Sequence, residues 1–78
     1  MNDKMILIQH AIQKYEKEEE LVEKLKNILS EKDVQRNLDT LIGTQRVRRI
    51  GPEILQNNKS HTELPNLLEH LKPLLEKI

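Results

Sequence analysis

Apolar residues recur at helical spacing through the N-terminal part of the chain. One row repeats every seven residues and a second row lies beside it; together they comprise Met5, Ile8, Ile12, Tyr15, Val22, Leu25 and Leu29. Residues at this spacing share one face of an α-helix, and residues 3–42 contain no Gly or Pro. The pattern therefore predicts one long helix over residues 3–30.

The apolar stripe fails at Glu19, inside the charged run of residues 16–20. One interpretation is a helix that bends there against a shorter partner or continues beyond the domain. The other is a solvated helical stretch with i,i+4 ion pairs such as Glu20 with Lys24. Both interpretations keep this part of the chain helical.

A second helix is predicted over residues 31–42. Ser30 followed by Asp33 has the spacing of a capping box, with Asp in place of Glu. The apolar row that follows contains Val34, Leu38, Leu41 and Ile42. Gly43 then suits the left-handed position that commonly ends a helix.

A third helix is predicted over residues 44–56, because Thr44 can cap it and Val47, Ile50 and Ile54 fall on one helical face. Gly51-Pro52 interrupts this row. Since proline lacks an N–H and is favoured in a first helical turn, we expect either one kinked helix or a short helix over 44–50 followed by a new turn at Pro52.

A last helix is predicted over residues 62–77, after a polar loop at 56–61 and a cap at Ser60 or Thr62. Its apolar row is the most regular in the chain and contains Leu64, Leu67, Leu68, Leu71, Leu74, Leu75 and Ile78. Pro73 should kink this helix or split off its last turn. The leucine stripe is either part of the core or a surface that docks in a partner's groove.

The composition favours helix-on-helix packing. The chain has 13 Leu and eight Ile but one Tyr and no Phe or Trp, so its core must be aliphatic; sheets favour β-branched and aromatic residues. We therefore expect an all-α fold: a small compact bundle of about four helices with a long first helix, in a single domain over residues 1–78. A homodimer through the first helix is one option for its assembly.

Charge and cysteine usage narrow the classes of partner. The chain has no cysteine, so neither a disulfide nor a thiolate metal site can form. Thirteen basic and thirteen acidic residues give no net charge, which disfavours a nucleic-acid or membrane binder that uses its whole surface. The longest apolar run, residues 5–8, is far shorter than a membrane span. We expect a cytoplasmic protein.

The reactive residue types do not form a catalytic or metal-binding pattern. His10, His61 and His70 lack the i,i+3 or i,i+4 partners of a helical metal site. The Ser and Thr residues at 30, 44, 60 and 62 stand where helix caps are needed, which explains them without nucleophilic chemistry. We expect no enzymatic activity, no metal and no cofactor.

The arginines form the most informative cluster. All four lie within residues 36–49, where Asp39 is the single acid. If a helix begins at Thr44, Arg46 and Arg49 share one face of it, where planar guanidinium groups can bind carboxylates or phosphates. The candidate partner-binding residues are Arg36, Gln45, Arg46, Arg48 and Arg49.

Three interpretations of the arginines remain open at this point. They can pair with the acids of residues 16–23 inside the molecule, bind a carboxylate-bearing protein, or bind nucleic acid. Residues 38–50 have the outline of a helix-turn-helix, with Gly43 at the turn and Gln45 and Arg46 at the start of a recognition helix. We expect a small regulatory or inhibitory protein that acts by binding another protein; the alternative is a helix-turn-helix-like nucleic-acid-binding regulator.

Overall fold

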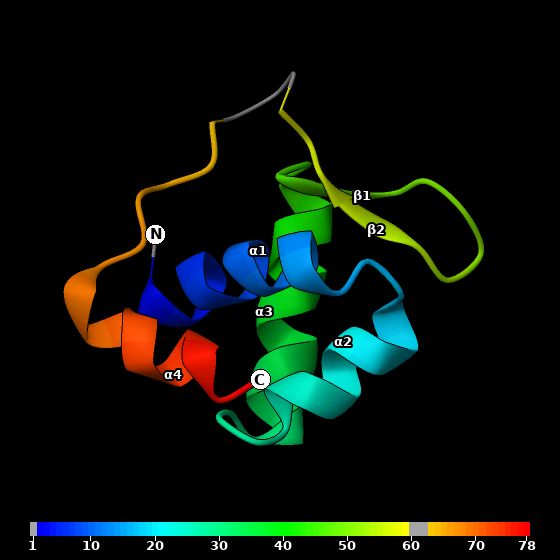
Figure 1. Ribbon diagram of the computed structural model, residues 1–78. Coiled ribbons are helices and arrows are strands. Elements are labelled where there is room, and N and C mark those ends of the chain that lie inside the picture. The colour runs from blue at the N-terminus through cyan, green and yellow to red at the C-terminus, as the bar shows by residue number, and fades with distance from the viewer. Residues whose placement is uncertain (1, 60–62) are drawn as a thin grey trace.

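The computed structural model describes residues 2–59 and 63–78. In chain order its elements are α1 (Asp3–Lys14), α2 (Glu18–Leu25), α3 (Glu31–Gly43), β1 (Val47–Arg49), β2 (Leu55–Asn57), a 3-10 turn η1 (Glu69–Leu71) and α4 (Lys72–Glu76). β1 and β2 form a two-stranded antiparallel sheet (Figure 1). The prediction of an all-α bundle is therefore wrong: the protein is a compact mixture of helices and one hairpin.

The prediction of one long helix over residues 3–30 is also wrong, because the chain leaves the helical conformation between α1 and α2. At this break, Leu55 N–H donates to the Glu16 carbonyl at 2.8 Å and Glu18 N–H donates to the Glu53 carbonyl at 2.7 Å. The backbone groups that a continuous helix would satisfy internally are thus paired with the hairpin. The break lets α2 turn back and bury Leu21 and Leu25 in the core.

The helix predicted over residues 31–42 is confirmed as α3. Ser30 is its N-cap, and its hydroxyl oxygen accepts from Asp33 N–H at 3.1 Å. The end of α3 differs from the prediction, because Gly43 is still helical and the left-handed residue is Gln45, with φ 64°. Thr44 does not begin a new helix; its hydroxyl donates back to the Thr40 carbonyl at 2.8 Å.

Residues 44–56 form the first strand and most of the second, not a helix. Val47 pairs with Asn57 and Arg49 pairs with Leu55. Val47 and Leu55 are buried while Arg48 and Gln56 are exposed, which is the two-residue alternation of a half-buried strand. Gly51 and Pro52 lie in the hairpin loop, where their turn-forming character is used.

The C-terminal helix is much shorter than predicted. Residues 63–68 have no regular structure and α4 is only five residues long. Pro73 neither kinks nor splits a helix, because it lies in the first turn of α4, where its missing N–H is harmless. The caps predicted at Ser60 and Thr62 lie outside the described residues.

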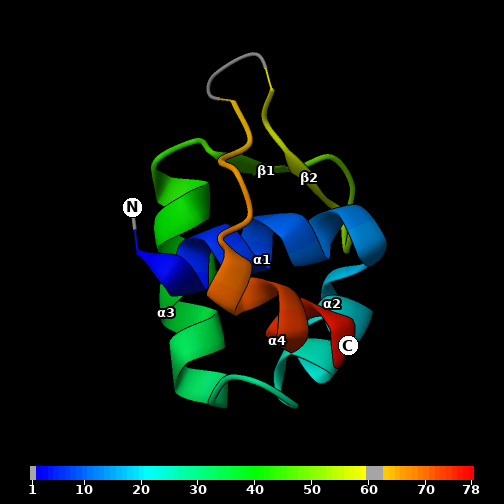
Figure 2. The same ribbon diagram turned by 60° about the vertical axis from the view of Figure 1, so that its left-hand side comes forward.

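The apolar core has two parts. The main part joins α1, α2, α3 and the inner face of the hairpin and contains Ile8, Ala11, Ile12, Leu21, Leu25, Val34, Leu38, Leu41, Val47 and Leu55. A smaller part lies where the C-terminal segment crosses α1, around Ile6, Leu7 and Leu71 (Figure 2). Of the leucine stripe, Leu71 is buried whereas Leu68 keeps 40% of its surface exposed.

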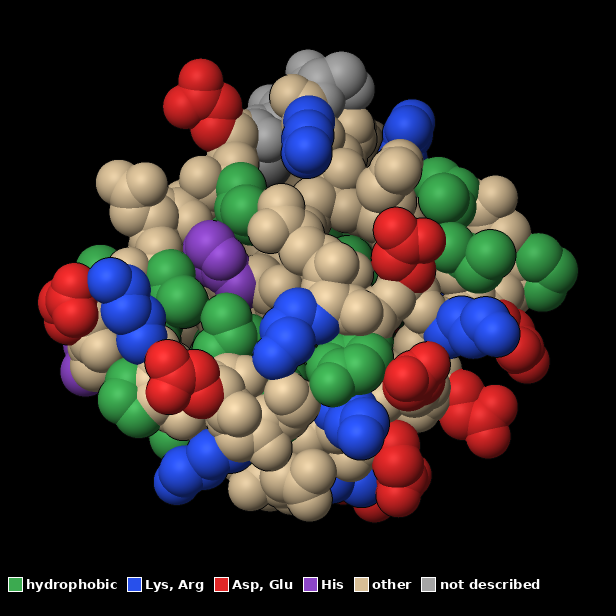
Figure 3. Space-filling view, in the orientation of Figure 1, with side chains coloured by type: hydrophobic (Ala, Val, Ile, Leu, Met, Phe, Trp, Pro, Cys, Tyr) green, Lys and Arg blue, Asp and Glu red, His purple; other side chains and the backbone are tan. Residues whose placement is uncertain are grey.

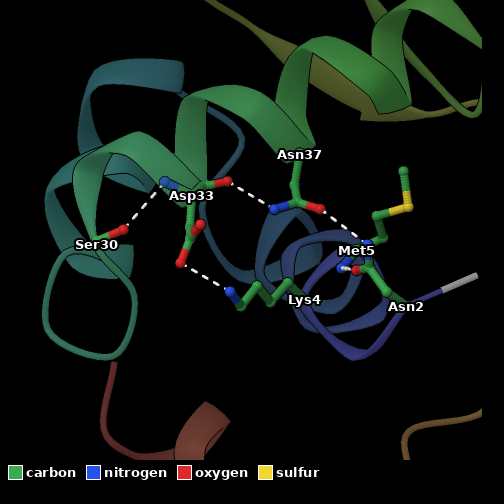
Figure 4. A network of polar contacts seen from close by, with 6 residues as sticks. All are labelled: Asn2, Lys4, Met5, Ser30, Asp33 and Asn37. Atoms are coloured by element: carbon green, nitrogen blue, oxygen red, sulfur yellow. Dashed lines mark hydrogen bonds and ion pairs between the residues drawn. The ribbon is translucent and has the colours of Figure 1, made fainter.

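A polar network fastens the start of α1 to the start of α3 (Figure 4). Asn2 caps α1 by accepting from Met5 N–H at 2.8 Å, and its amide donates to Asn37 Oδ1 at 3.2 Å. Lys4 reaches Asp33 at 2.8 Å. The hairpin packs against α1 through β2. In the described part of the chain, no helix is both long and apolar enough to cross a membrane.

Candidate binding surface

The hairpin separates the three arginines at positions 46, 48 and 49. Arg46 lies one residue before β1, and its carbonyl accepts from Asn58 N–H at 2.9 Å, which continues the pairing of the hairpin by one residue. By the two-residue alternation of a strand, Arg46 and Arg48 then project to the side opposite buried Val47. Arg48 is exposed, and its Nη2 donates to Gln56 Oε1 on the neighbouring strand at 3.1 Å. Within residues 2–59 and 63–78 the Arg46 side chain makes no hydrogen bond or ion pair. Both cations are therefore available to a partner on the outer face.

Arg49 has an intramolecular role. It projects from the inner face of β1 and its guanidinium donates to both carboxylate oxygens of Glu18, with the Nη2–Oε1 distance at 3.0 Å. These hydrogen bonds, more than any other influence, raise the pKa of Arg49 above its ordinary value. The pairing of arginines with the acids of residues 16–23, left open by the sequence, thus holds for Arg49.

Gln45 marks the junction between α3 and β1. Gln45 N–H donates to the Ile42 carbonyl at 3.1 Å and Arg46 N–H donates to the Leu41 carbonyl at 3.0 Å. This is the hydrogen-bond pattern of a Schellman motif, in which the left-handed residue is usually Gly. The motif ends α3 and sets the direction in which Arg46 enters the hairpin.

Arg36 lies on α3 and not on the hairpin with the other three arginines. It lies on the exposed side of α3, about two helical turns, or ~10 Å, before the end of that helix. The structure therefore divides the five candidate residues: Arg46 and Arg48 share a face, Gln45 precedes them, Arg49 is paired with Glu18, and Arg36 stands apart. A recognition helix cannot begin at Gln45, because residues 47–49 form a strand.

The hairpin loop adds an apolar feature that the sequence analysis assigned to a helix interior. Ile50 keeps 49% of its surface exposed at the start of the loop, followed by exposed Pro52. In Figure 3 hydrophobic side chains gather at the outer edge of the hairpin, while acidic side chains gather below it over α2. The signal that could have revealed this tip is Gly51-Pro52, a turn former between two short alternating segments.

An open groove runs between the C-terminal end of α1 and the hairpin. It has a volume of about 540 Å³ and its lining includes Gln13, Glu16, Arg48, Gln56, Asn57 and Lys59. Asn57 is only 8% exposed; its Nδ2 donates to the Gln9 carbonyl at 2.8 Å, and its Oδ1 has no partner in the described residues. Of these lining residues, Arg48 is the one that the sequence predicts as a binding residue, because the others meet only through the packing of the hairpin on α1.

The histidines in the described residues make structural contacts. His10 Nε2 lies 2.7 Å from the Pro65 carbonyl, so this nitrogen carries the proton and donates it. His70 Nε2 lies 2.6 Å from Asp3 Oδ2. Among residues 2–59 and 63–78 no group of three or more His, Cys, Asp or Glu side chains is arranged to hold a metal ion. His61 lies outside the described residues.

Comparison with protein-family models, with curated protein sequences and with solved structures finds no match for this chain.

Proposed function

We propose that this chain is a non-catalytic protein that acts by binding a protein partner through the outer face and loop of its hairpin. The observation that carries the proposal is the combination of Arg46 and Arg48 on the outer side of the hairpin with the exposed side chain of Ile50, which follows β1. Arginine flanking an exposed aliphatic group is suited to a protein surface that presents carboxylates around an apolar contact.

The same face supports nucleic-acid binding less well. The acids of α2 lie next to the hairpin, and Arg49 is already neutralised by Glu18, so few unpaired cations remain for a run of phosphates. Single-strand binding by base stacking also lacks its usual residue, because Tyr15 is the one aromatic side chain in the sequence. Nucleic acid is therefore an outcome that the experiment must be able to detect.

The experiment uses the full chain as bait in a lysate of its native host, with and without nuclease. The test variant is Arg46→Gln combined with Arg48→Gln, and the matched control is Lys32→Gln, an exposed cation in the first turn of α3. We expect a protein that the wild type and the control retain after nuclease treatment and that the double variant loses. Both variants should melt within a few degrees of the wild type, as surface substitutions do.

Two outcomes would overturn the proposal. One is a partner that the double variant retains at wild-type yield, which would remove the hairpin arginines from the binding surface. The other is retention that disappears with nuclease and weakens steeply with added salt, which would indicate nucleic acid instead.

A further inference from the structure

The groove between α1 and the hairpin has the size and lining of a ligand site. Its volume of about 540 Å³ falls within the ~300–1,000 Å³ typical of such sites. Arg48, which donates to Gln56 Oε1, and Lys59 are the two cations among its lining residues. The Lys59 side chain has no partner within residues 2–59 and 63–78.

The amide side chains of the groove match the hydrogen-bonding groups of a peptide backbone. Gln13 and Gln56 are exposed and each offers two N–H donors and one carbonyl acceptor. Asn57 also lines the groove, but it is buried and its Nδ2 already donates to the Gln9 carbonyl at 2.8 Å. The exposed groups that an extended backbone can pair with are therefore the amides of Gln13 and Gln56.

The charges of the groove discriminate between classes of ligand. Arg48 and Lys59 favour a carboxylate or a phosphate, but Glu16 lines the same groove and its carboxylate has no side-chain partner in residues 2–59 and 63–78. An anion at this corner would disfavour a polyphosphate chain. A peptide tolerates it, because one acidic side chain can lie at the cations while neutral backbone passes Glu16.

We propose that this groove binds an extended acidic segment of a partner protein, with a carboxylate at Arg48 and Lys59 and its main chain at the amides of Gln13 and Gln56. The inference rests on the proposed function, since it names the part of the partner that the hairpin surface recognises. Gln13 becomes a specificity-determining residue, because it faces the groove from α1 and belongs to neither strand.

The test begins with a random peptide library displayed on phage and selected on the immobilised full chain. We expect the selected sequences to be enriched in Asp and Glu. A fluorescently labelled copy of the most enriched peptide then serves as the probe, and its affinity for the variants is measured by fluorescence anisotropy.

Two substitutions of Gln13 should change the affinity for the probe in opposite directions. Gln13→Glu should weaken binding of the probe about ten-fold, because it adds a like charge to the site, and Gln13→Lys should strengthen it. Gln35→Glu makes the same chemical change on the exposed side of α3 and should leave the affinity unchanged. A merely structural role of Gln13 would move both of its variants in the same direction.

Three results would overturn the inference: a selection without acidic enrichment, equal affinities for Gln13→Glu and Gln13→Lys, or displacement of the probe by a DNA duplex of random sequence. The two proposals can fail separately. If the captured partner depends on Arg46 but is indifferent to Gln13→Glu, the hairpin binds a partner and the groove does not take part.

Discussion

Gln45 adopts a backbone conformation that is unfavourable for a residue with a Cβ atom. Its φ of 64° places it in the left-handed region, whereas Gly43, two residues earlier, is helical. A Cβ built on Gly43 would meet nothing within 4 Å. Glycine would be favoured at position 45, where the backbone is left-handed, whereas alanine would be favoured at position 43, which lies inside the helix.

These two residues predict stabilising substitutions at adjacent positions. Gln45→Gly should raise the free energy of unfolding by about 0.5–1 kcal/mol by removing the left-handed strain. Gly43→Ala should raise it by a similar amount, about 0.5–1 kcal/mol, because alanine is preferred inside a helix. Urea unfolding followed by circular dichroism measures both. A fall in stability for Gly43→Ala would mean that residue 43, and not residue 45, is left-handed.

The conformation of Gln45 also bears on function. Strained residues persist where the surrounding structure determines them, and they are common beside binding sites. Gln45 immediately precedes Arg46, and its carbonyl accepts from Asn58 Nδ2 at 3.0 Å, which ties the entrance of the hairpin to its exit. Gln45→Gly should therefore raise the stability of the fold, and a change in binding of the proposed partner by the same variant would show that the conformation of residue 45 also matters for binding.

At the scale of elements, the sequence predicts α3 well because two independent signals coincide. The capping pair Ser30 and Asp33 stands at its start, and an apolar row with a helical period follows. Both signals are local, and the helix needs no distant partner to be recognised.

The hairpin could not be recognised in the same way. Val47, Ile50 and Ile54 fit a helical face, and strands of three residues are too short for a two-residue alternation to outweigh that fit. The break after α1 depends on pairing between Glu16 and Leu55, which are 39 positions apart (55 minus 16). Non-local pairing of this kind leaves no periodic trace in the sequence.

Of the candidate surface, the sequence predicts the arginine cluster but not the groove beside it. The arginine cluster of residues 46–49 does lie at the surface, and one of the arginines does pair with the acidic run. Which one pairs follows from the strand, because alternate side chains project to opposite faces. The amides of the groove, Gln13 and Asn57, come from elements that only the tertiary fold brings together.

The C-terminal segment provides a prediction about the smaller part of the core. Leu71 is 3% exposed and packs near Ile6 and Leu7. Leu71→Ala should lower the free energy of unfolding by about 2–5 kcal/mol through lost burial and a residual cavity. Leu68→Ala, at a site that is 40% exposed, is the control and should change it by less than about 0.5 kcal/mol.

Equal effects of these two substitutions in urea unfolding would mean that Leu71 does not anchor the segment. A small effect at both sites would leave the leucine stripe free to dock on a partner, which is the other interpretation of its periodicity.

Across the whole molecule, equal numbers of acids and bases conceal an uneven surface. Four acids of the chain lie on α2, at residues 18, 19, 20 and 23, while Arg46 and Arg48 lie on the outer face of the hairpin. Such polarity orients an approaching charged partner even when the net charge is zero. Salt should therefore slow association with the proposed partner more than it speeds dissociation.

One carboxylate gives the molecule a defined response to acid. The hydrogen bond from Lys4, at 2.8 Å, is the largest influence that holds the pKa of Asp33 below its ordinary value of 3.8. A lowered pKa in the folded state means that ionised Asp33 stabilises the fold above the unfolded pKa, which is that ordinary value, and that this contribution is lost as the pH falls through the lower pKa of the folded state.

Thermal unfolding at about pH 7 and about pH 3, on either side of that unfolded pKa, measures this contribution. The drop in Tm on acidification should be smaller for Asp33→Asn than for the wild type, and also smaller for Lys4→Gln, because each variant lacks the ion pair already at neutral pH. Lys32→Gln should keep the wild-type acid response. If the Tm falls by the same amount on acidification in the wild type and all three variants, the Lys4–Asp33 pair does not couple pH to folding.

The crossing of the C-terminal segment over α1 has a consequence for how the molecule opens. The segment is held by the His10–Pro65 contact, by Lys14 Nζ donating to the Ile78 carbonyl at 2.9 Å, and by the smaller part of the core. Leu75 and Ile78 at its end also pack against the main part of the core. Neither of the two hydrogen bonds involves α3 or the hairpin. The segment can therefore detach by a sub-global unfolding that uncovers one side of the main core but leaves the hydrogen bonds of α3 and the hairpin in place. Its amide protons should exchange with solvent through that opening, earlier than those of α3, and each opening bares Ile6 and Leu7 to proteases and to other chains.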